Sequence, residues 1–242
     1  MSSMCSDTSG LSSQMILHYS VFETSIRYLG GILSAYELSE EKFPRLVDKA
    51  KEVADKMAFA WDGVSGHMEY VFNSLEAKYY WQKNAIPFNE VDFSKDKAVS
   101  GLTNLASLGT LTLEWGTLTK HTGNDTYRQL AEKTVKAVMA LTPPLPGLPA
   151  QTVDPATSAF VDKYVVSLAL AINFYSITHL DCQTWGGGSD SYFEYLIKYP
   201  RLTNTNDTSF VTAWKTAVDT SITTLLRVSD PRRDSLHTNA PQ

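Results

Sequence analysis

The sequence is poor in cysteine, in charge of one sign and in long apolar runs. It has two cysteines, Cys5 and Cys182, too few for a disulfide framework or a four-ligand zinc site. Lysine and arginine number 21 against 26 acidic residues, which argues against nucleic acid as a partner because phosphate binding needs clustered cations. The longest apolar run, 165–180, is broken by polar residues and is too short and too polar to cross a bilayer.

Targeting signals and common catalytic fingerprints are also missing. Residues 1–20 have neither the basic start nor the apolar stretch of a signal peptide. No Gly-x-Ser-x-Gly elbow, P-loop or dinucleotide fingerprint occurs, and the five histidines lack metal-ligand spacing. What is present is a globular composition, 43% hydrophobic and 19% charged, in a chain long enough for one large domain or two small ones.

Helical periodicity dominates the chain. Apolar residues recur at helical spacing in six segments, and we predict helices over 21–38, 42–61, 102–119, 125–141, from about 189, and 207–227. Gly123 suits a C-terminal cap and Ser189 an N-cap. Gly30 and Gly31 lie inside the first helix, where each costs about 1 kcal/mol against alanine. This cost predicts a close approach of another backbone and a tightly packed helix.

Two of these helices carry similar patterns. The segment FPRLVDK (43–49) resembles YRQLAEK (127–133), and each follows a longer helix and a short polar turn. A repeated helical hairpin is the unit of a solenoid or a closed toroid. Two ordinary amphipathic helices with chance matches account for the pattern equally well.

Two groups of residues could carry chemistry. Glu23 and Arg27 lie four apart on one helix face and can pair, although a surface ion pair has the same pattern. Asp190 and Glu194, at the same spacing, follow three consecutive glycines and repel unless solvent, a cation, an arginine or a raised pKa relieves them. Trp185 and the neighbouring aromatics provide flat faces for a sugar ring. A solvated, acid-rich helix start explains the second group as well.

Two Asn-Asp-Thr triplets, 124–126 and 206–208, are N-glycosylation acceptors if the protein is secreted. Such triplets also arise by chance.

Several long motifs resemble the fungal class I α-1,2-mannosidases of glycoside hydrolase family 47. They are VFETSIRYLGGILSAY (21–36), AIPFN (85–89), GTLTLEWGTLTKHTGN (109–124) and WGGGSDSYFEYLIK (185–198). The resemblance implies an all-α fold, part of an (αα)7 barrel of helical hairpins with about three of seven hairpins present. It also implies inverting hydrolysis of α-1,2-linked mannose from N-linked glycans, with calcium at the base of the barrel.

The resemblance assigns roles position by position. Glu23 becomes the general acid and Arg27 the residue that holds it. Asp190 becomes the second acid/base or water-positioning carboxylate, because an inverting glycosidase needs one carboxyl on the leaving oxygen and another on water. Glu194 and Trp185 become substrate-binding residues. The expected partner is a high-mannose N-glycan. The expected compartment is the endoplasmic reticulum or Golgi, or the exterior, with any membrane attachment through an N-terminal anchor that this sequence lacks.

The sequence departs from the family pattern in several places. A Leu-Arg-Pro-Glu segment with a third carboxylate and the threonine that ligates calcium have no counterpart. We expect 1–20 and 228–242 to be unmatched and 21–227 to be a partial catalytic domain, interrupted by insertions at 64–82 and 166–183. Both insertions begin Val-Ser and end in Gln, as an intron translated in frame would, and Val-Ser also opens the tail. Lineage-specific loops and a genuine truncation are the alternative.

Three functions remain open from the sequence. The first is an α-1,2-mannosidase of which this chain is a fragment, inactive and insoluble as written because the second insertion precedes the glycine loop. The second is a non-catalytic relative that binds mannose glycans. The third is a helical-repeat interaction module, which the paired acids and the glycine loop disfavour.

Overall fold

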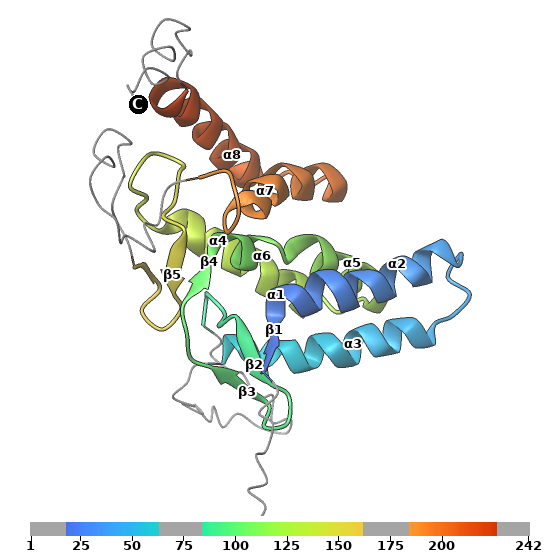
Figure 1. Ribbon diagram of the computed structural model, residues 1–242. Coiled ribbons are helices and arrows are strands. Elements are labelled where there is room, and N and C mark those ends of the chain that lie inside the picture. The colour runs from blue at the N-terminus through green and yellow to red at the C-terminus, as the bar shows by residue number, and fades with distance from the viewer. Residues whose placement is uncertain (1–17, 63–83, 162–183, 227–242) are drawn as a thin grey trace, which may run out of the picture.

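The computed structural model describes residues 18–62, 84–161 and 184–226. These residues form three helical hairpins and two small sheets (Figure 1). The helices are α1 (Val21–Glu23), η1 (Thr24–Leu29), α2 (Gly30–Leu38), α3 (Arg45–Met57), η2 (Ala58–Trp61), α4 (Leu105–Gly109), α5 (Thr112–Thr122), α6 (Thr126–Ala140), α7 (Asp190–Thr203), α8 (Ser209–Thr220) and η4 (Ser221–Leu225). The predicted all-α class and the count of three hairpins are confirmed.

The hairpins pack in chain order around two hydrophobic cores. The pair α2–α3 lies at one end, α5–α6 in the middle and α7–α8 at the other end (Figure 1). The first core, between α2, α3, α5 and α6, centres on Trp61 and Trp115, whose rings meet edge to face at 5.0 Å. The second core joins α4, α6, α7 and α8 around Tyr199 and Phe210. This is the arrangement of a partial (αα)7 barrel.

The two end hairpins expose apolar side chains that the middle one does not. Among the described residues, no large apolar side chain of α5 or α6 is exposed. Tyr28 and Leu38 on the first hairpin are 64% and 86% exposed, and Leu202 and Leu226 at the far end are each 70% exposed. A hairpin of a toroid buries both flanks against its neighbours. The exposed faces are therefore the edges of an incomplete ring.

One predicted helix proves to be two. The single helix expected over 102–119 breaks at Thr110, which leaves helical geometry at φ −99° and ψ 53°. The helix α4 starts under an Asn104 side-chain cap, whose Oδ1 accepts the Ser107 N–H at 2.9 Å, and α5 ends at the left-handed Gly123 as predicted. The break lets Gly109 lie against the backbone of Tyr192, closer than any side chain would permit. In a continuous helix, Gly109 would face another direction, and its contact with Tyr192 would be lost.

The strands escaped prediction because they are only two or three residues long. One sheet has the antiparallel order β1 (His18–Ser20), β2 (Glu90–Asp92), β3 (Lys97–Val99); the other has β4 (Thr103–Asn104), β5 (Thr152–Asp154), β6 (Ala159–Phe160). Alternation cannot be recognised over so few residues. Each sheet precedes a helix of interest: β1 runs directly into α1, and β4 into α4.

Several sequence-based expectations fall outside the described residues. They are both cysteines, the whole of the apolar run 165–180, the insertions at 64–82 and 166–183, and the tail at 228–242. Within the described ranges, no helix has the length and apolar character needed to cross a membrane.

Candidate functional site

Glu23 is held at the start of the first helix by its neighbours on both sides. The Val21 N–H donates to the Asn89 carbonyl at 2.7 Å, and the Ser20 hydroxyl accepts the Glu23 N–H at 3.2 Å as an N-cap. The side chain is 46% exposed and pairs with Arg27, as the spacing predicted. Both charges therefore face open space, with the carboxylate held by the guanidinium.

A π-helix follows Glu23 directly. The segment η1 has π-helical hydrogen bonding over six residues, Thr24–Leu29. Single-turn π segments inside α-helices occur frequently at functional sites. The inner face is anchored at Ser25, whose hydroxyl accepts the Trp115 indole N–H at 3.0 Å and donates to the Met57 sulfur at 3.6 Å. Apolar periodicity predicts a helix here but carries no signal for its π-helical register.

The three glycines form a loop that fixes the start of α7. Gly188 has φ +86°, and a Cβ there would lie 2.1 Å from the Gln151 side-chain nitrogen. The Gln151 amide donates to the Gly187 carbonyl at 2.5 Å, and the Ala106 N–H donates to the Gly188 carbonyl at 2.9 Å. Glycine is thus required by both backbone angle and space. The loop ties the start of α7 to the sheet β4–β5–β6 and to α4.

Asp190 and Glu194 lie on the exposed face of α7, one turn apart. Glu194 pairs with Lys198 one turn further on, so a lysine cation and solvent relieve the like-charge repulsion. Asp190 donates its N–H to the Gly186 carbonyl at 2.9 Å, and its Oδ1 accepts the Ser191 N–H at 2.9 Å. Asp190 has no cationic partner among the described residues. Its second carboxylate oxygen is therefore available to water or a ligand.

Trp185 uses much of its indole to hold the loop. One ring face stacks on Phe193 with centroids 4.2 Å apart, and its N–H donates to the Ser221 hydroxyl at 2.8 Å. The side chain is 37% exposed. Only one face is therefore left for the stacking on sugar that the sequence suggested.

Glu114, beside Trp115 in the motif 109–124, is a functional candidate that no sequence pattern singles out. Its Oε1 accepts a hydrogen bond from the Tyr195 hydroxyl at 2.8 Å, while its Oε2 is buried without a partner. Burial, the largest influence, raises the pKa of this carboxyl. Its Cγ would lie 3.3 Å from a Cβ on Gly30. The predicted approach of another backbone is therefore wrong: a side chain lies against Gly30, and Gly31 has open space around it.

Glu114 and Trp115 connect the two candidate groups. Trp115 bonds Ser25, two residues from Glu23, and Glu114 bonds Tyr195, the neighbour of Glu194. No hydrogen bond or ion pair joins the Glu23–Arg27 pair directly to Asp190 or Glu194 in the described part of the chain. The two groups are therefore positioned relative to each other through α5.

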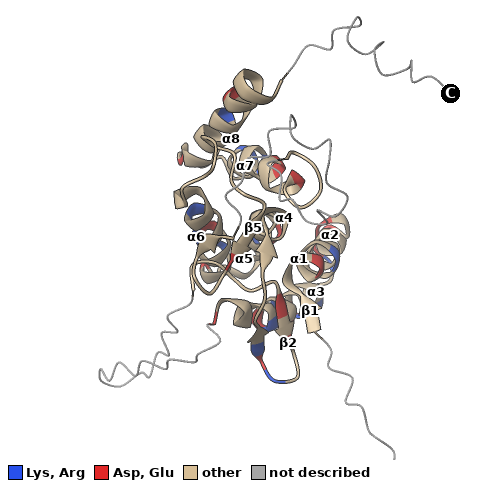
Figure 2. Cartoon of the chain, turned by 60° about the vertical axis from the view of Figure 1, so that its left-hand side comes forward, with Lys and Arg blue, Asp and Glu red and all other residues tan. Residues whose placement is uncertain are grey.

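Residues of both charge signs are distributed over the helices (Figure 2). No three His, Cys, Asp or Glu side chains within the described ranges are grouped so that they could hold a metal ion. Calcium at the base of the barrel stays a prediction of the resemblance.

Comparison with known proteins agrees with the motifs. The profile of glycosyl hydrolase family 47 matches residues 8–241. A mannosyl-oligosaccharide α-1,2-mannosidase of Coccidioides posadasii is 34% identical over 231 residues, covering 89% of this chain and 37% of that protein. A mannosyl-oligosaccharide α-1,2-mannosidase 1B of Aspergillus phoenicis is 32% identical over 194 residues, covering 74% of this chain and 31% of that protein.

A solved structure shares the fold. The α-1,2-mannosidase from Trichoderma reesei matches with a TM-score of 0.65 and 27% identity, over 86% of this chain and 39% of that one. The chain thus spans under two fifths of the length of these relatives. With the profile match across nearly all residues and the hairpin arrangement, these findings show that the chain belongs to glycosyl hydrolase family 47.

Proposed function

We propose that this chain carries part of the active site of an inverting α-1,2-mannosidase that trims high-mannose N-glycans in the secretory pathway. The observation that carries the proposal is the exposed Glu23–Arg27 pair at the start of a π-helix, connected through Trp115 and Glu114 of α5 to α7, which begins at Asp190. Two separately held carboxylates are what an inverting glycosidase needs.

Each carboxylate has a distinct role in the proposed reaction. Glu23, as a carboxylic acid, gives its proton to the glycosidic oxygen as the bond from that oxygen to the anomeric carbon breaks. Asp190 holds a water and takes its proton as the water oxygen bonds to the anomeric carbon from the opposite face. The product is mannose of inverted configuration. Arg27 orients Glu23, and Glu194 and the free face of Trp185 contact sugar.

Calcium enters no step of this proposal, and the described ranges hold no group of three His, Cys, Asp or Glu side chains that could bind a metal ion. The chain by itself is expected to be inactive and poorly soluble. Its end hairpins expose apolar edges, and contiguous exposed apolar surface promotes association.

A chimera tests the proposal. Residues 18–226 without 64–82 and 166–183 replace the matching region of the Coccidioides posadasii relative, and mannose release from α-1,2-linked mannobiose is measured. We expect release by the chimera and a loss of at least 100-fold on Glu23→Gln or Asp190→Asn. Lys49→Gln, at an exposed ion pair on α3, is the matched control and keeps activity.

The outcome against the proposal is a folded chimera whose activity is unchanged by Glu23→Gln. Binding of mannobiose without turnover would instead favour the non-catalytic glycan-binding relative.

A further inference from the structure

Both Asn-Asp-Thr triplets lie just before helices of the structure. Asn124 precedes α6, and Asn206 lies in the connection between α7 and α8. An Asn-x-Thr triplet on the surface of a secretory protein is an N-glycan acceptor. The two triplets have the same sequence, so any difference between them has to come from their surroundings.

Hydrogen bonds hold the residues next to Asn206 in place, but none involves the Asn206 side chain within the described residues. Asn204 ends α7 in the left-handed conformation at φ +50°. The Asp207 N–H donates to the Thr205 hydroxyl at 3.1 Å, and Asp207 Oδ1 caps the Ser209 N–H at 2.9 Å. Asn206 is exposed, and within the described residues its amide has no hydrogen-bond partner.

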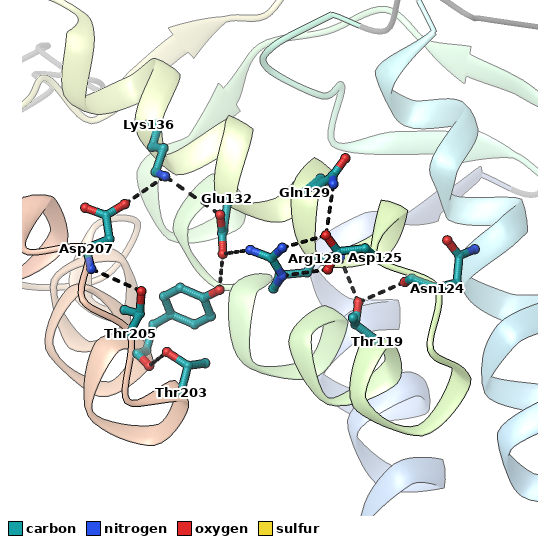
Figure 3. Close-up of polar contacts among 11 residues, drawn as sticks. Thr119, Asn124, Asp125, Arg128, Gln129, Glu132, Lys136, Thr203, Thr205 and Asp207 are labelled. Atoms are coloured by element: carbon teal, nitrogen blue, oxygen red, sulfur yellow. Dashed lines mark hydrogen bonds and ion pairs between the residues drawn. The ribbon is translucent and has the colours of Figure 1, made fainter.

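The middle residue of the triplet faces into the molecule. Asp207 pairs with Lys136 of α6 at 2.8 Å, and Lys136 lies 3.7 Å from Glu132 (Figure 3). These ion pairs continue to Arg128 and join α6 to the α7–α8 connection. Asp207 therefore anchors the triplet, while its exposed neighbours on both sides face solvent. A glycan on Asn206 leaves every one of these contacts intact.

Asn124 is differently placed because its side chain is part of the turn. Its Oδ1 accepts the Thr126 N–H at 3.1 Å, and its carbonyl accepts the Thr119 hydroxyl at 3.1 Å (Figure 3). Tyr127, the residue that follows this triplet, is 3% exposed, and its hydroxyl donates to Asp55 at 2.6 Å. The exposed Asn124 side chain is thus held in the turn that starts α6, whereas the Asn206 side chain makes no hydrogen bond within the described residues.

We propose that Asn206 is the N-glycan acceptor of this chain and that Asn124 stays largely unmodified. The co-reactant is a lipid diphosphate-linked oligosaccharide. The Asn206 side-chain nitrogen forms a bond to C1 of the first sugar and loses one proton, while the bond from C1 to the diphosphate oxygen breaks and the lipid diphosphate leaves. The proposal depends on the proposed function only for the secretory compartment.

Expression of the full chain in yeast behind a foreign secretion signal tests this. An affinity tag carries one known acceptor, whose modification proves entry into the lumen. Peptide:N-glycosidase in heavy-oxygen water marks each occupied asparagine, and peptide mass spectrometry measures occupancy. The foreign signal makes the result independent of the chain's own targeting and of its mannosidase activity.

We expect Asn206 to be at least fivefold more occupied than Asn124. Asn206→Gln and Thr208→Ala abolish the glycan, whereas Thr208→Ser retains it, which separates acceptor chemistry from structural damage. Asn124→Gln is the matched control and leaves the glycan in place. An unmodified Asn206 beside a modified tag overturns the proposal, and so does equal or greater occupancy of Asn124.

Discussion

The hydroxyl of Tyr195 donates to Glu114 Oε1 at 2.8 Å across the packed faces of α7 and α5. The partner oxygen, Oε2, is buried with no hydrogen bond. A buried carboxylate with an unsatisfied oxygen is costly, and protonation relieves that cost. Glu114 therefore stabilises the junction between the two candidate groups best in its neutral form.

This relationship predicts a pH dependence of stability. Burial raises the pKa of Glu114 above its ordinary value of 4.5, so its favourable contribution is complete below that value. The contribution is lost as pH rises through the raised pKa. In the parent chimera, the unfolding free energy should therefore rise as the pH is lowered. We expect Glu114→Gln, which cannot ionise, to make this rise smaller. Urea unfolding from pH 4 to 8 measures the effect.

Glu52→Gln is the control for that series, since Glu52 is an exposed partner of Lys49. Equal pH profiles for Glu114→Gln and the parent would show that the carboxyl is charged at all these values, against the account.

The buried indole of Trp61 gives a second prediction. Its N–H donates to the Thr134 hydroxyl at 2.9 Å, and both side chains are fully buried. Thr134→Val keeps the volume but leaves the indole N–H without an acceptor, so we expect a loss of about 1–3 kcal/mol in unfolding free energy. Thr216→Val, whose hydroxyl bonds only its own helix, is expected to change it by under about 0.5 kcal/mol. Equal losses of unfolding free energy in Thr134→Val and Thr216→Val would contradict a stabilising hydrogen bond between Trp61 and Thr134.

We expect substitution by alanine to have opposite effects on stability at two glycines, Gly109 and Gly31. A Cβ on Gly109 would lie 2.7 Å from Tyr192 Cα, whereas one on Gly31 meets nothing within 4 Å. Gly109→Ala should cost about 1–3 kcal/mol or more through overpacking, and Gly31→Ala should add about 0.5–1 kcal/mol in its helix. Thermal unfolding of both variants checks the signs, and a stable Gly109→Ala variant would show that α4 and α7 can separate freely.

The two segments that flank the first insertion are hydrogen-bonded directly to each other. The Asn84 N–H donates to the Trp61 carbonyl at 2.7 Å, and the Phe88 N–H donates to the Ala60 carbonyl at 2.9 Å. Deleting 64–82 leaves three residues between Trp61 and Asn84, enough for one α-turn. We expect the deletion to preserve these contacts and to stabilise by on the order of 1 kcal/mol through a shorter loop.

Sequencing of the mature transcript across 63–83 provides an independent check, because an intron would be missing from it. A transcript that retains the segment, together with a deletion that destabilises, would establish the insertion as a structural part of the protein.

The sequence predicted the helices well where apolar periodicity was long. The hairpins and the cap at Gly123 followed from local pattern, and Glu23 pairs with Arg27 at the spacing expected. Ser189 occupies the N-cap position of α7, but its side chain makes no capping hydrogen bond, so that part of the prediction is wrong. The break at Thr110 was missed because it depends on a distant contact of Gly109, which no local pattern records.

The exposed charged residues of the candidate site could be predicted from the sequence, but the buried contacts that position them could not. The connecting role of Glu114 depends on Tyr195 and Gly30, each more than 80 residues away in sequence. The π-helical register of η1 and the stacking of Trp185 on Phe193 are likewise results of tertiary packing. Helical spacing cannot distinguish a stacked tryptophan from one free to bind a sugar.

The anomeric configuration of the released sugar tests the central claim most directly. Proton NMR of the chimera acting on α-1,2-linked mannobiose distinguishes β-mannose from α-mannose before the two equilibrate. If Glu23 protonates the leaving oxygen while Asp190 activates water on the opposite face, β-mannose appears first, and Asp190→Asn suppresses it. Initial release of α-mannose would mean a covalent intermediate and a different use of the two carboxylates, and would contradict the account.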